Sequence, residues 1–397
     1  MFEKKTVFIL GAGASWHYNQ PTGEDLVKDV RDKAEELIKR LRQKPDRTLY
    51  HGQLVEFLAN KFRGDSRQFN TIDFLQDFID RLTHVDPPVI DYFLEWNEDL
   101  RSIGQMMIAW MIIDREREYV EKKCNKNRQR LVNQDPFRNI NGRSIECEKF
   151  KDNWYRFVLY KMLSGCASPD QVADNNVKFV TFNYDVSLES YLYKGLKQIK
   201  FMKPGEISAD AAANILQDRF FHMYGKIRKN PFVDPVPVIE DTRAYEDDYK
   251  QYADVLDKIY NASQDIRTIG NNKDDPVHDA VKAVIKDAED VYILGYGFDQ
   301  ENSKRLGLED SLSATSVYIE ENTNRQIDRK VYFTNFGDIN TINKKASKIF
   351  AENDKEFLKD YIYYGGNPHD PSRSNHFYEK STRNVYDALA NDFGLIE

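Results

Sequence analysis

Apolar residues occur along this chain in two patterns that predict different elements. Short runs of β-branched and aromatic residues, most of them followed by glycine or asparagine, are typical of buried strands. Such runs occupy residues 6–10, 177–182, 220–224, 290–294, 315–319 and 330–334. Between about 31 and 165, apolar residues recur every three or four positions, which predicts a block of amphipathic helices. Further helices are expected over 249–260, 276–288, 341–352 and 377–395.

Strands that alternate with helices favour a mainly parallel sheet covered by helices on both faces. We therefore expect an α/β, Rossmann-like fold with a large inserted helical subdomain. The sheet domain is expected to comprise residues 1–30 and 166–397, and the helical subdomain residues 31–165. Ligands of such sheets lie at the carboxyl ends of the strands, so the residues that follow each strand are the candidates for chemistry.

Composition narrows the function classes. The 397 residues are 41% hydrophobic and 31% charged, and no apolar run approaches the roughly 20 residues of a membrane span. The first strand begins too early for a signal peptide to precede it, so we expect a cytoplasmic protein without membrane association. A net charge of -8 argues against direct nucleic-acid binding, and the basic residues between 115 and 130 are interpreted as a solvated helix face. Three cysteines cannot build a four-cysteine zinc site, and no metal is expected.

The first strand runs into a turn of small residues, Gly11-Ala12-Gly13-Ala14-Ser15. Such a turn lets backbone N–H groups approach a phosphate, and the dipole of the following helix favours the same anion. The pattern predicts a site for the pyrophosphate of a nucleotide, with a tight structural turn as the alternative. A dehydrogenase fingerprint would require a third glycine where this chain has Trp16, which argues against hydride transfer.

Polar residues and glycines follow the other strands too. They are Asn183, Tyr184 and Asp185 after the second strand, His222 and Gly225 at the third, Gly295 and Gly297 after the fourth, and Asn335 after the strand at 330–334. Each alone is explained by a turn, a helix cap or a structural histidine. Together, beside a glycine turn, they favour a site that processes a nucleotide.

In this order the motifs resemble those of the SIR2-like superfamily, and in particular the NAD-consuming domains of bacterial anti-phage defence systems. The matching segments are Gly11-Ala12-Gly13-Ala14-Ser15, Pro21-Thr22-Gly23, Thr181-Phe182-Asn183-Tyr184-Asp185 (similar to T-x-N-x-D), the His222 strand with Gly225, Gly295-Tyr296-Gly297-Phe298, and Asn335. Two features depart from the family. The zinc module of sirtuin deacylases is missing, and Tyr224 stands where the family has its catalytic histidine, directly before glycine.

The resemblance implies cleavage of NAD⁺ into nicotinamide and ADP-ribose, with NAD⁺ as a substrate and without a metal. It implies that Asn183 orients the substrate, that Asp185 stabilises the developing cation, and that His222 or another group is the general base. It also implies NAD⁺-binding roles for Gly11, Ala12, Gly13, Ser15, Tyr184, Gly295, Gly297 and Asn335.

A free NAD⁺ hydrolase is toxic, so the resemblance further implies a gated effector of abortive infection. The expected partner is a separate HerA-like ATPase, with a short Argonaute as the second choice, and the helical subdomain is expected to mediate homo-oligomerisation. Three competing interpretations are a non-catalytic sensor of NAD⁺ or ADP-ribose, a sirtuin-type deacylase and a nucleic-acid-processing protein. Tyr224 favours the first, while the cysteine count and the net charge argue against the other two.

Overall fold

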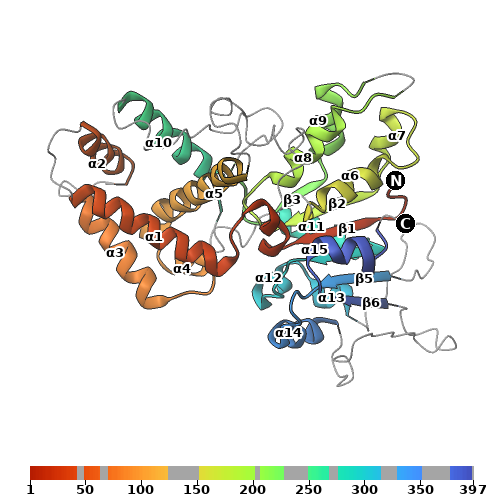
Figure 1. The fold of residues 1–397 in the computed structure, drawn as a ribbon. Coiled ribbons are helices and arrows are strands. Elements are labelled where there is room, and N and C mark those ends of the chain that lie inside the picture. Colours follow the sequence, from red (N-terminus) through yellow and green to blue (C-terminus); the bar gives the residue numbers. More distant parts are fainter. Residues whose placement is uncertain are drawn as a thin grey trace.

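The chain folds into a sheet half and a helical half (Figure 1). This computed structural model describes residues 1–42, 49–62, 70–123, 152–201, 206–227, 249–267, 276–313, 329–350 and 376–395. The strand predicted at 315–319 lies outside these residues, as do residues 124–130 of the basic segment between 115 and 130.

The sheet has six parallel strands in the order β3-β2-β1-β4-β5-β6. They are β1 (Thr6–Leu10), β2 (Val177–Thr181), β3 (Phe220–His222), β4 (Asp290–Leu294), β5 (Arg329–Thr334) and β6 (His376–Ser381). The order runs outward in both directions from the central pair β1 and β4, which makes this pair the point where a Rossmann-like sheet takes its ligand. The predicted α/β fold with a parallel sheet is confirmed.

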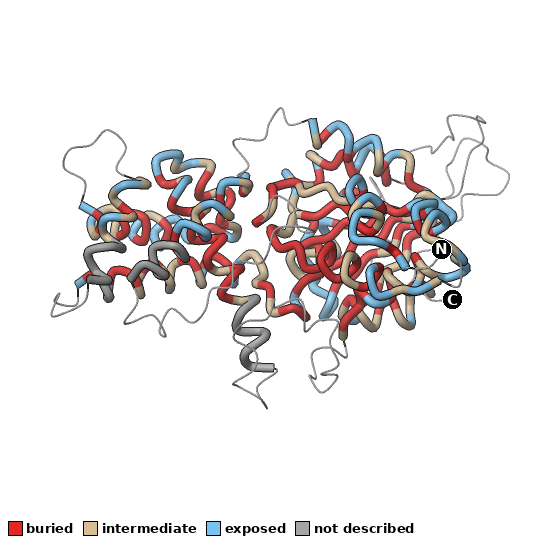
Figure 2. The backbone as a smooth tube through the Cα atoms, turned by 90° about the horizontal axis from the view of Figure 1, so that it is seen from above, coloured by how far each residue is buried: buried red, intermediate tan, exposed pale blue. Residues whose placement is uncertain are grey.

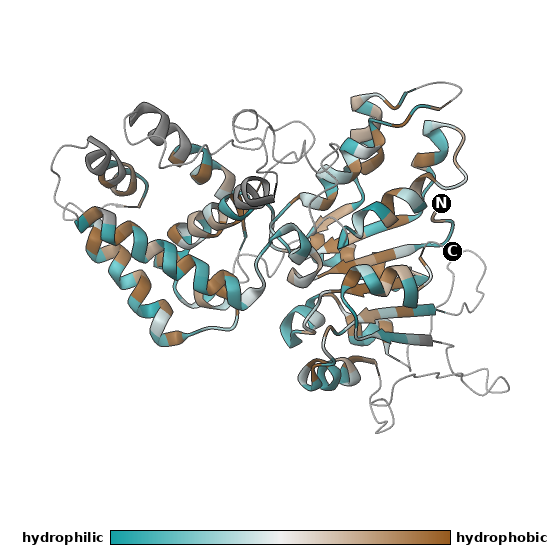
Figure 3. Ribbon diagram, viewed as in Figure 1, coloured by the Kyte–Doolittle hydropathy of each residue, from teal (hydrophilic) through white to brown (hydrophobic). Residues whose placement is uncertain are grey.

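Alternate residues of each strand enter two different apolar layers. Val7 and Ile9 of β1 pack with α11 (Pro276–Lys286), α13 (Leu308–Leu312) and α14 (Asn340–Phe350). Phe8 and Leu10 pack on the other face with α6 (Tyr155–Leu163), α8 (Ser187–Leu196) and α9 (Ala209–Gln217). Because both faces are covered, the central strands β1, β2 and β4 are mostly apolar, as Figure 3 shows.

The remaining elements of the sheet half are short. They are the 3₁₀ turn η1 (Ala12–Tyr18), α7 (Pro169–Ala173), α12 (Gln300–Arg305), α15 (Val385–Asp387) and the turn η5 (Ala388–Asp392). The sequence predicted a helix over 377–395, and this is wrong for its first residues. Residues 376–381 pair along their full length with β5, because hydrogen bonding to an open sheet edge outweighs the weak local preference for a helix.

The helical half has a core of its own, visible as a second buried region in Figure 2. It is built from α1 (Gly23–Arg42), α2 (Leu49–Phe62), α3 (Thr71–Val85), α4 (Ile90–Trp96), the turn η2 (Glu98–Leu100), α5 (Arg101–Lys123) and α10 (Tyr249–Ser263). The packing differs from the predicted limits of 31–165 in three elements. Helix α1 continues across residues 30 and 31, α6 packs on the sheet, and α10 from the C-terminal part of the chain joins the helical core.

Candidate functional site

The turns that follow β1 and β4 are in direct backbone contact. Gly11 N donates to Leu294 O at 3.0 Å, and Gly13 N donates to Gly295 O at 3.1 Å. A Cβ atom added to Gly11 would lie 2.4 Å from Gly295 O, and one added to Gly295 would lie 2.2 Å from Ala14 N. Gly295 also has a φ of +58°. These positions therefore require glycine, whereas a Cβ at Gly297 would meet nothing within 4 Å.

This contact changes the role expected for the first glycine turn. The N–H groups of Gly11, Gly13 and Ala14 already donate to the carbonyl oxygens of Leu294, Gly295 and Gly11. The helix that follows is a 3₁₀ turn of seven residues, so its dipole is small. Three of the N–H groups that the sequence assigned to a pyrophosphate are thus used to join β1 to β4.

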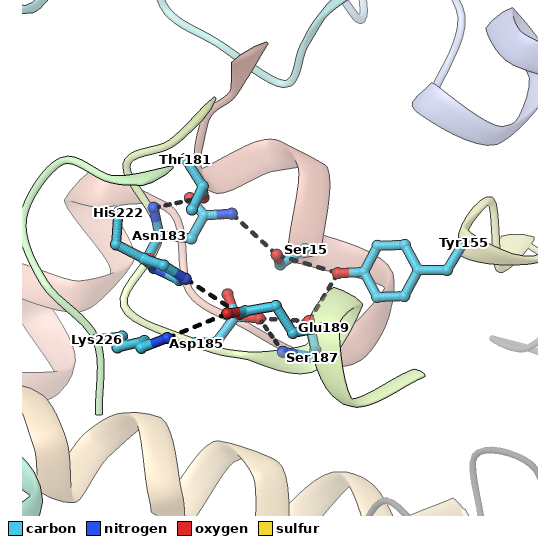
Figure 4. A network of polar contacts seen from close by, with 9 residues as sticks. All are labelled: Ser15, Tyr155, Thr181, Asn183, Asp185, Ser187, Glu189, His222 and Lys226. Atoms are coloured by element: carbon cyan, nitrogen blue, oxygen red, sulfur yellow. Dashed lines mark hydrogen bonds and ion pairs between the residues drawn. The ribbon is translucent and has the colours of Figure 1, made fainter. Parts of the chain in front are cut away.

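The two main predicted motifs meet at the carboxyl edge of the sheet. Asn183 follows β2, and its backbone N–H donates to Thr181 Oγ1 at 3.0 Å. Its side-chain amide Nδ2 donates to Ser15 Oγ at 2.9 Å (Figure 4). A hydrogen bond between side chains 168 residues apart therefore links the turn after β1 to the T-x-N-x-D turn after β2.

A series of buried hydroxyl groups continues from Ser15 to Asp185 (Figure 4). Ser15 Oγ lies 3.3 Å from the hydroxyl oxygen of Tyr155, which lies 2.7 Å from Ser187 Oγ. Ser187 in turn donates both its hydroxyl and its backbone N–H to Asp185 Oδ1. Burial raises the pKa of Asp185, and the hydrogen bonds from Ser187 and the proximity of Ser15 and His222 only partly oppose this effect.

His222 lies between two hydrogen-bond acceptors. Its Nδ1 faces the carbonyl oxygen of Asn183 at 3.2 Å, and its Nε2 faces Glu189 Oε2 at 3.1 Å. Because neither partner has a proton to give, both bonds form only when the imidazole carries a proton on each nitrogen. Both ring nitrogens of His222 therefore face acceptors within the protein, which does not favour the expected role as general base.

Glu189 is a buried carboxylate that contacts a histidine and a lysine. Besides His222, Lys226 Nζ lies 3.3 Å from its Oε1. Burial would raise the pKa of Glu189, but His222 and Lys226 together hold it below its ordinary value. The group therefore remains charged and fixes the histidine ring beneath the Asn183 turn.

Tyr184 connects the sheet half to the helical half. Its buried hydroxyl donates to Asp91 Oδ1 of α4. Tyr92 of α4 makes a second such contact, donating to Asp299 Oδ1 at 2.9 Å. Burial raises the pKa of Asp91 to about 6, although the hydrogen bond from Tyr184 opposes it. The structure thus gives Tyr184 a bridging contact, whereas the family resemblance implied NAD⁺ binding.

Asn335 lies apart from the Asn183 network. Its Nδ2 donates to Ile339 O at 3.0 Å and to Asn343 Oδ1 at 2.8 Å, and its Oδ1 accepts from Ile339 N at 3.1 Å. The side chain closes the loop before α14, and the residue is only 1% exposed. These contacts account for its position after β5 without a ligand.

The sequence missed four members of the network, namely Tyr155, Ser187, Glu189 and Lys226. Two of them had a weak signal, because Ser187 and Glu189 lie on the helix that begins directly after the predicted Asp185. Tyr155 had none, since it comes from α6, within the segment assigned to the helical subdomain.

Comparison with models of known protein families gave no match, and comparison with curated proteins gave none either. The resemblance to SIR2-like domains therefore rests on the motifs. Within the described ranges, no three histidine, cysteine, aspartate or glutamate side chains are grouped to hold a metal. Nor is any helix of that part of the chain long and apolar enough to cross a membrane.

Proposed function

We propose that this chain cleaves NAD⁺ at the bond between nicotinamide and ribose. The observation that carries the proposal is the hydrogen bond between Asn183 and Ser15. It joins the glycine turn to the T-x-N-x-D turn beside the central strand pair, where sheets of this type take nucleotides. The family motifs supply the reaction class, and this contact supports it by bringing two of them together.

The side chains at this edge suit the charge changes of the reaction. Nicotinamide leaves as a neutral molecule, so positive charge develops on the ribose, and a carboxylate in a low-dielectric setting stabilises such a charge strongly. Asp185 is the carboxylate nearest to Asn183 along the chain, and it is 7% exposed. The Asn183 amide donates one N–H to Ser15 and keeps its second N–H and its oxygen for a ribose hydroxyl or a water.

Substitution of Asn183 tests the proposal. We expect Asn183→Ala to lower nicotinamide release by about 100-fold or more, because the orienting amide is lost. Asn176→Ala is the matched control, since Asn176 is exposed and lies at the opposite end of β2. The assay is chromatography of nicotinamide and ADP-ribose, with circular dichroism to verify folding. A folded Asn183→Ala protein that retains the wild-type rate would contradict the assignment.

A sensor that binds NAD⁺ or ADP-ribose without cleavage is the second candidate. Two observations favour it: His222 faces acceptors on both ring nitrogens, and Tyr224 is buried with its hydroxyl donated to Asn302. Burial also raises the pKa of Tyr224, which makes it a poor base. Calorimetric binding of NAD⁺ without nicotinamide release, alone and with an ATPase partner, would support the sensor.

We further propose that the activity is gated and serves anti-phage defence in the cytoplasm. A HerA-like ATPase is the first candidate partner, a short Argonaute is the second, and the helical half is the candidate surface for homo-oligomerisation. Co-expression with each partner, followed by light scattering and NAD⁺ measurement in infected cells, tests these points. A chain that neither binds nor cleaves NAD⁺, with or without a partner, would refute the proposed function.

A further inference from the structure

The series of hydroxyl groups between Ser15 and Asp185 has a defined direction. A carboxylate only accepts hydrogen bonds, so the Ser187 hydroxyl must donate to Asp185. Its oxygen therefore accepts from Tyr155, whose single hydrogen is then used. Ser15 must consequently donate to Tyr155, while its own oxygen accepts from Asn183. Every hydroxyl in the series thus points its hydrogen toward the carboxylate.

We propose that Ser15, Tyr155 and Ser187 form a proton relay that carries the proton of the attacking water to the Asp185 carboxylate. This inference rests on the proposed function and assigns its base. The relay is shielded from solvent, since Ser15, Tyr155, Ser187 and Asp185 are 4%, 1%, 1% and 7% exposed. It begins at the hydroxyl that also binds Asn183, which is the orienting residue of the proposed reaction.

The proton balance of the step is complete. The C–N bond breaks, its electron pair leaves with nicotinamide, and the water oxygen forms the new bond to the ribose carbon. The water proton passes to Ser15, and the hydroxyl protons of Ser15, Tyr155 and Ser187 each move one position toward Asp185. Asp185 ends protonated, every hydroxyl is restored with its hydrogen bond reversed, and the return of the proton to solvent resets the relay.

The charged surroundings suit Asp185 as the proton acceptor. Burial raises its pKa, which brings it closer to neutral pH, where a base works best. The charged groups near it are His222 and Glu189, and Glu189 is itself paired with Lys226. His222 is committed to Glu189 and to the Asn183 carbonyl, so Asp185 rather than His222 is connected to the Ser15 end.

Removal of the central hydroxyl tests the relay. Tyr155→Phe keeps the ring that stacks on Tyr18 at 4.5 Å but breaks the series. We expect kcat for nicotinamide release to fall about 100-fold, the size typical of lost general-base catalysis, with KM changed less than about twofold. A proton inventory in mixed H₂O and D₂O should be curved in the wild type and linear in the variant.

Tyr18→Phe is the matched control. It removes a buried hydroxyl that bonds to Asn153 Oδ1 at 2.9 Å, next to the same ring but outside the series. Its kcat should equal that of the wild type. A Tyr155→Phe protein with the wild-type rate would overturn the relay while leaving the proposed function intact. A wild-type protein that binds and cleaves no NAD⁺ would overturn the proposed function instead.

A second measurement reads the relay in the resting protein. With ¹³C-labelled aspartate, the carboxyl resonance of Asp185 should titrate although the residue is buried, because the relay exchanges its proton with solvent. Tyr155→Phe should move the titration midpoint upward, since the Ser187 hydroxyl is no longer polarised by Tyr155, and Tyr18→Phe should leave it in place. A midpoint that is identical in all three proteins would overturn the relay, whether or not NAD⁺ is cleaved.

Discussion

Four glycines allow the contact between the β1 and β4 turns to be measured as a free energy. An alanine Cβ would collide with backbone at Gly11 and Gly295 but meet nothing within 4 Å at Gly165 and Gly297. Gly165 and Gly295 have φ of +76° and +58°, whereas Gly11 has a φ of -93° and Gly297 lies outside the left-handed region. Alanine substitutions at these four glycines therefore separate the cost of a left-handed backbone from the cost of a steric clash with the added methyl group.

The expected losses follow from these two terms. A left-handed conformation costs an alanine about 1–2 kcal/mol, which is the full effect expected for Gly165→Ala. Forcing a methyl group into packed structure costs about 1–3 kcal/mol, expected for Gly11→Ala. Gly295→Ala carries both terms, and it also strains the bond between Gly13 N and Gly295 O, so we expect about 3–5 kcal/mol. Gly297→Ala should change stability by less than about 1 kcal/mol.

Urea unfolding of the four variants measures these values. Trp154 reports the site directly, because its indole Nε1 donates to Ala14 O at 2.9 Å, and its resonance in fluorotryptophan-labelled protein can be followed by ¹⁹F NMR. Gly297→Ala should be the most stable of the four variants and Gly295→Ala the least stable, with Gly165→Ala and Gly11→Ala between them. If Gly295→Ala were no less stable than Gly165→Ala, the close approach of the two turns would be refuted.

Two further substitutions address buried charges. The folded pKa of Asp91, about 6, exceeds its ordinary 3.8, so Asp91 contributes stability below pH 4 that is lost as pH rises through 6. The free energy of unfolding of Asp91→Asn, measured in urea, should therefore rise by up to about 3 kcal/mol relative to that of the wild type between pH 4 and 7. A difference between the two proteins that stays constant over this pH range would contradict the buried carboxyl. Arg329 donates to the carbonyl oxygens of Ala288, Ser311 and Lys286 while 1% exposed. Arg329→Met should lower the free energy of unfolding by about 3 kcal/mol, whereas Lys330→Met at the exposed neighbouring position should lower it by less than about 0.5 kcal/mol. Equal melting temperatures of the two variants would show that these hydrogen bonds of Arg329 do not stabilise the fold.

The local pattern of apolar residues was sufficient to predict most strands of the sheet. The strands β1, β2, β4 and β5 begin and end within one residue of their predicted limits, because each is a run of apolar residues closed by glycine or asparagine. Strand β6 was missed, since the only apolar residues of His376–Ser381 are the adjacent Phe377 and Tyr378, and the segment acquires its conformation by pairing with β5. Partner choice of this kind depends on residues 47 positions away, which no local window contains.

The residues of the candidate site could likewise be predicted only in part from the sequence. The sequence by itself determined that small and polar residues follow the strands, because turns and caps require particular side chains at particular positions. It therefore located Ser15, Asn183 and Asp185. Only the tertiary structure decided which of these side chains meet, that Tyr155 from α6 completes the series of hydroxyls, and that His222 is held by Glu189. A hydrogen bond forms between groups that the whole fold brings within about 3 Å, and chain-distant partners leave no periodicity in the sequence.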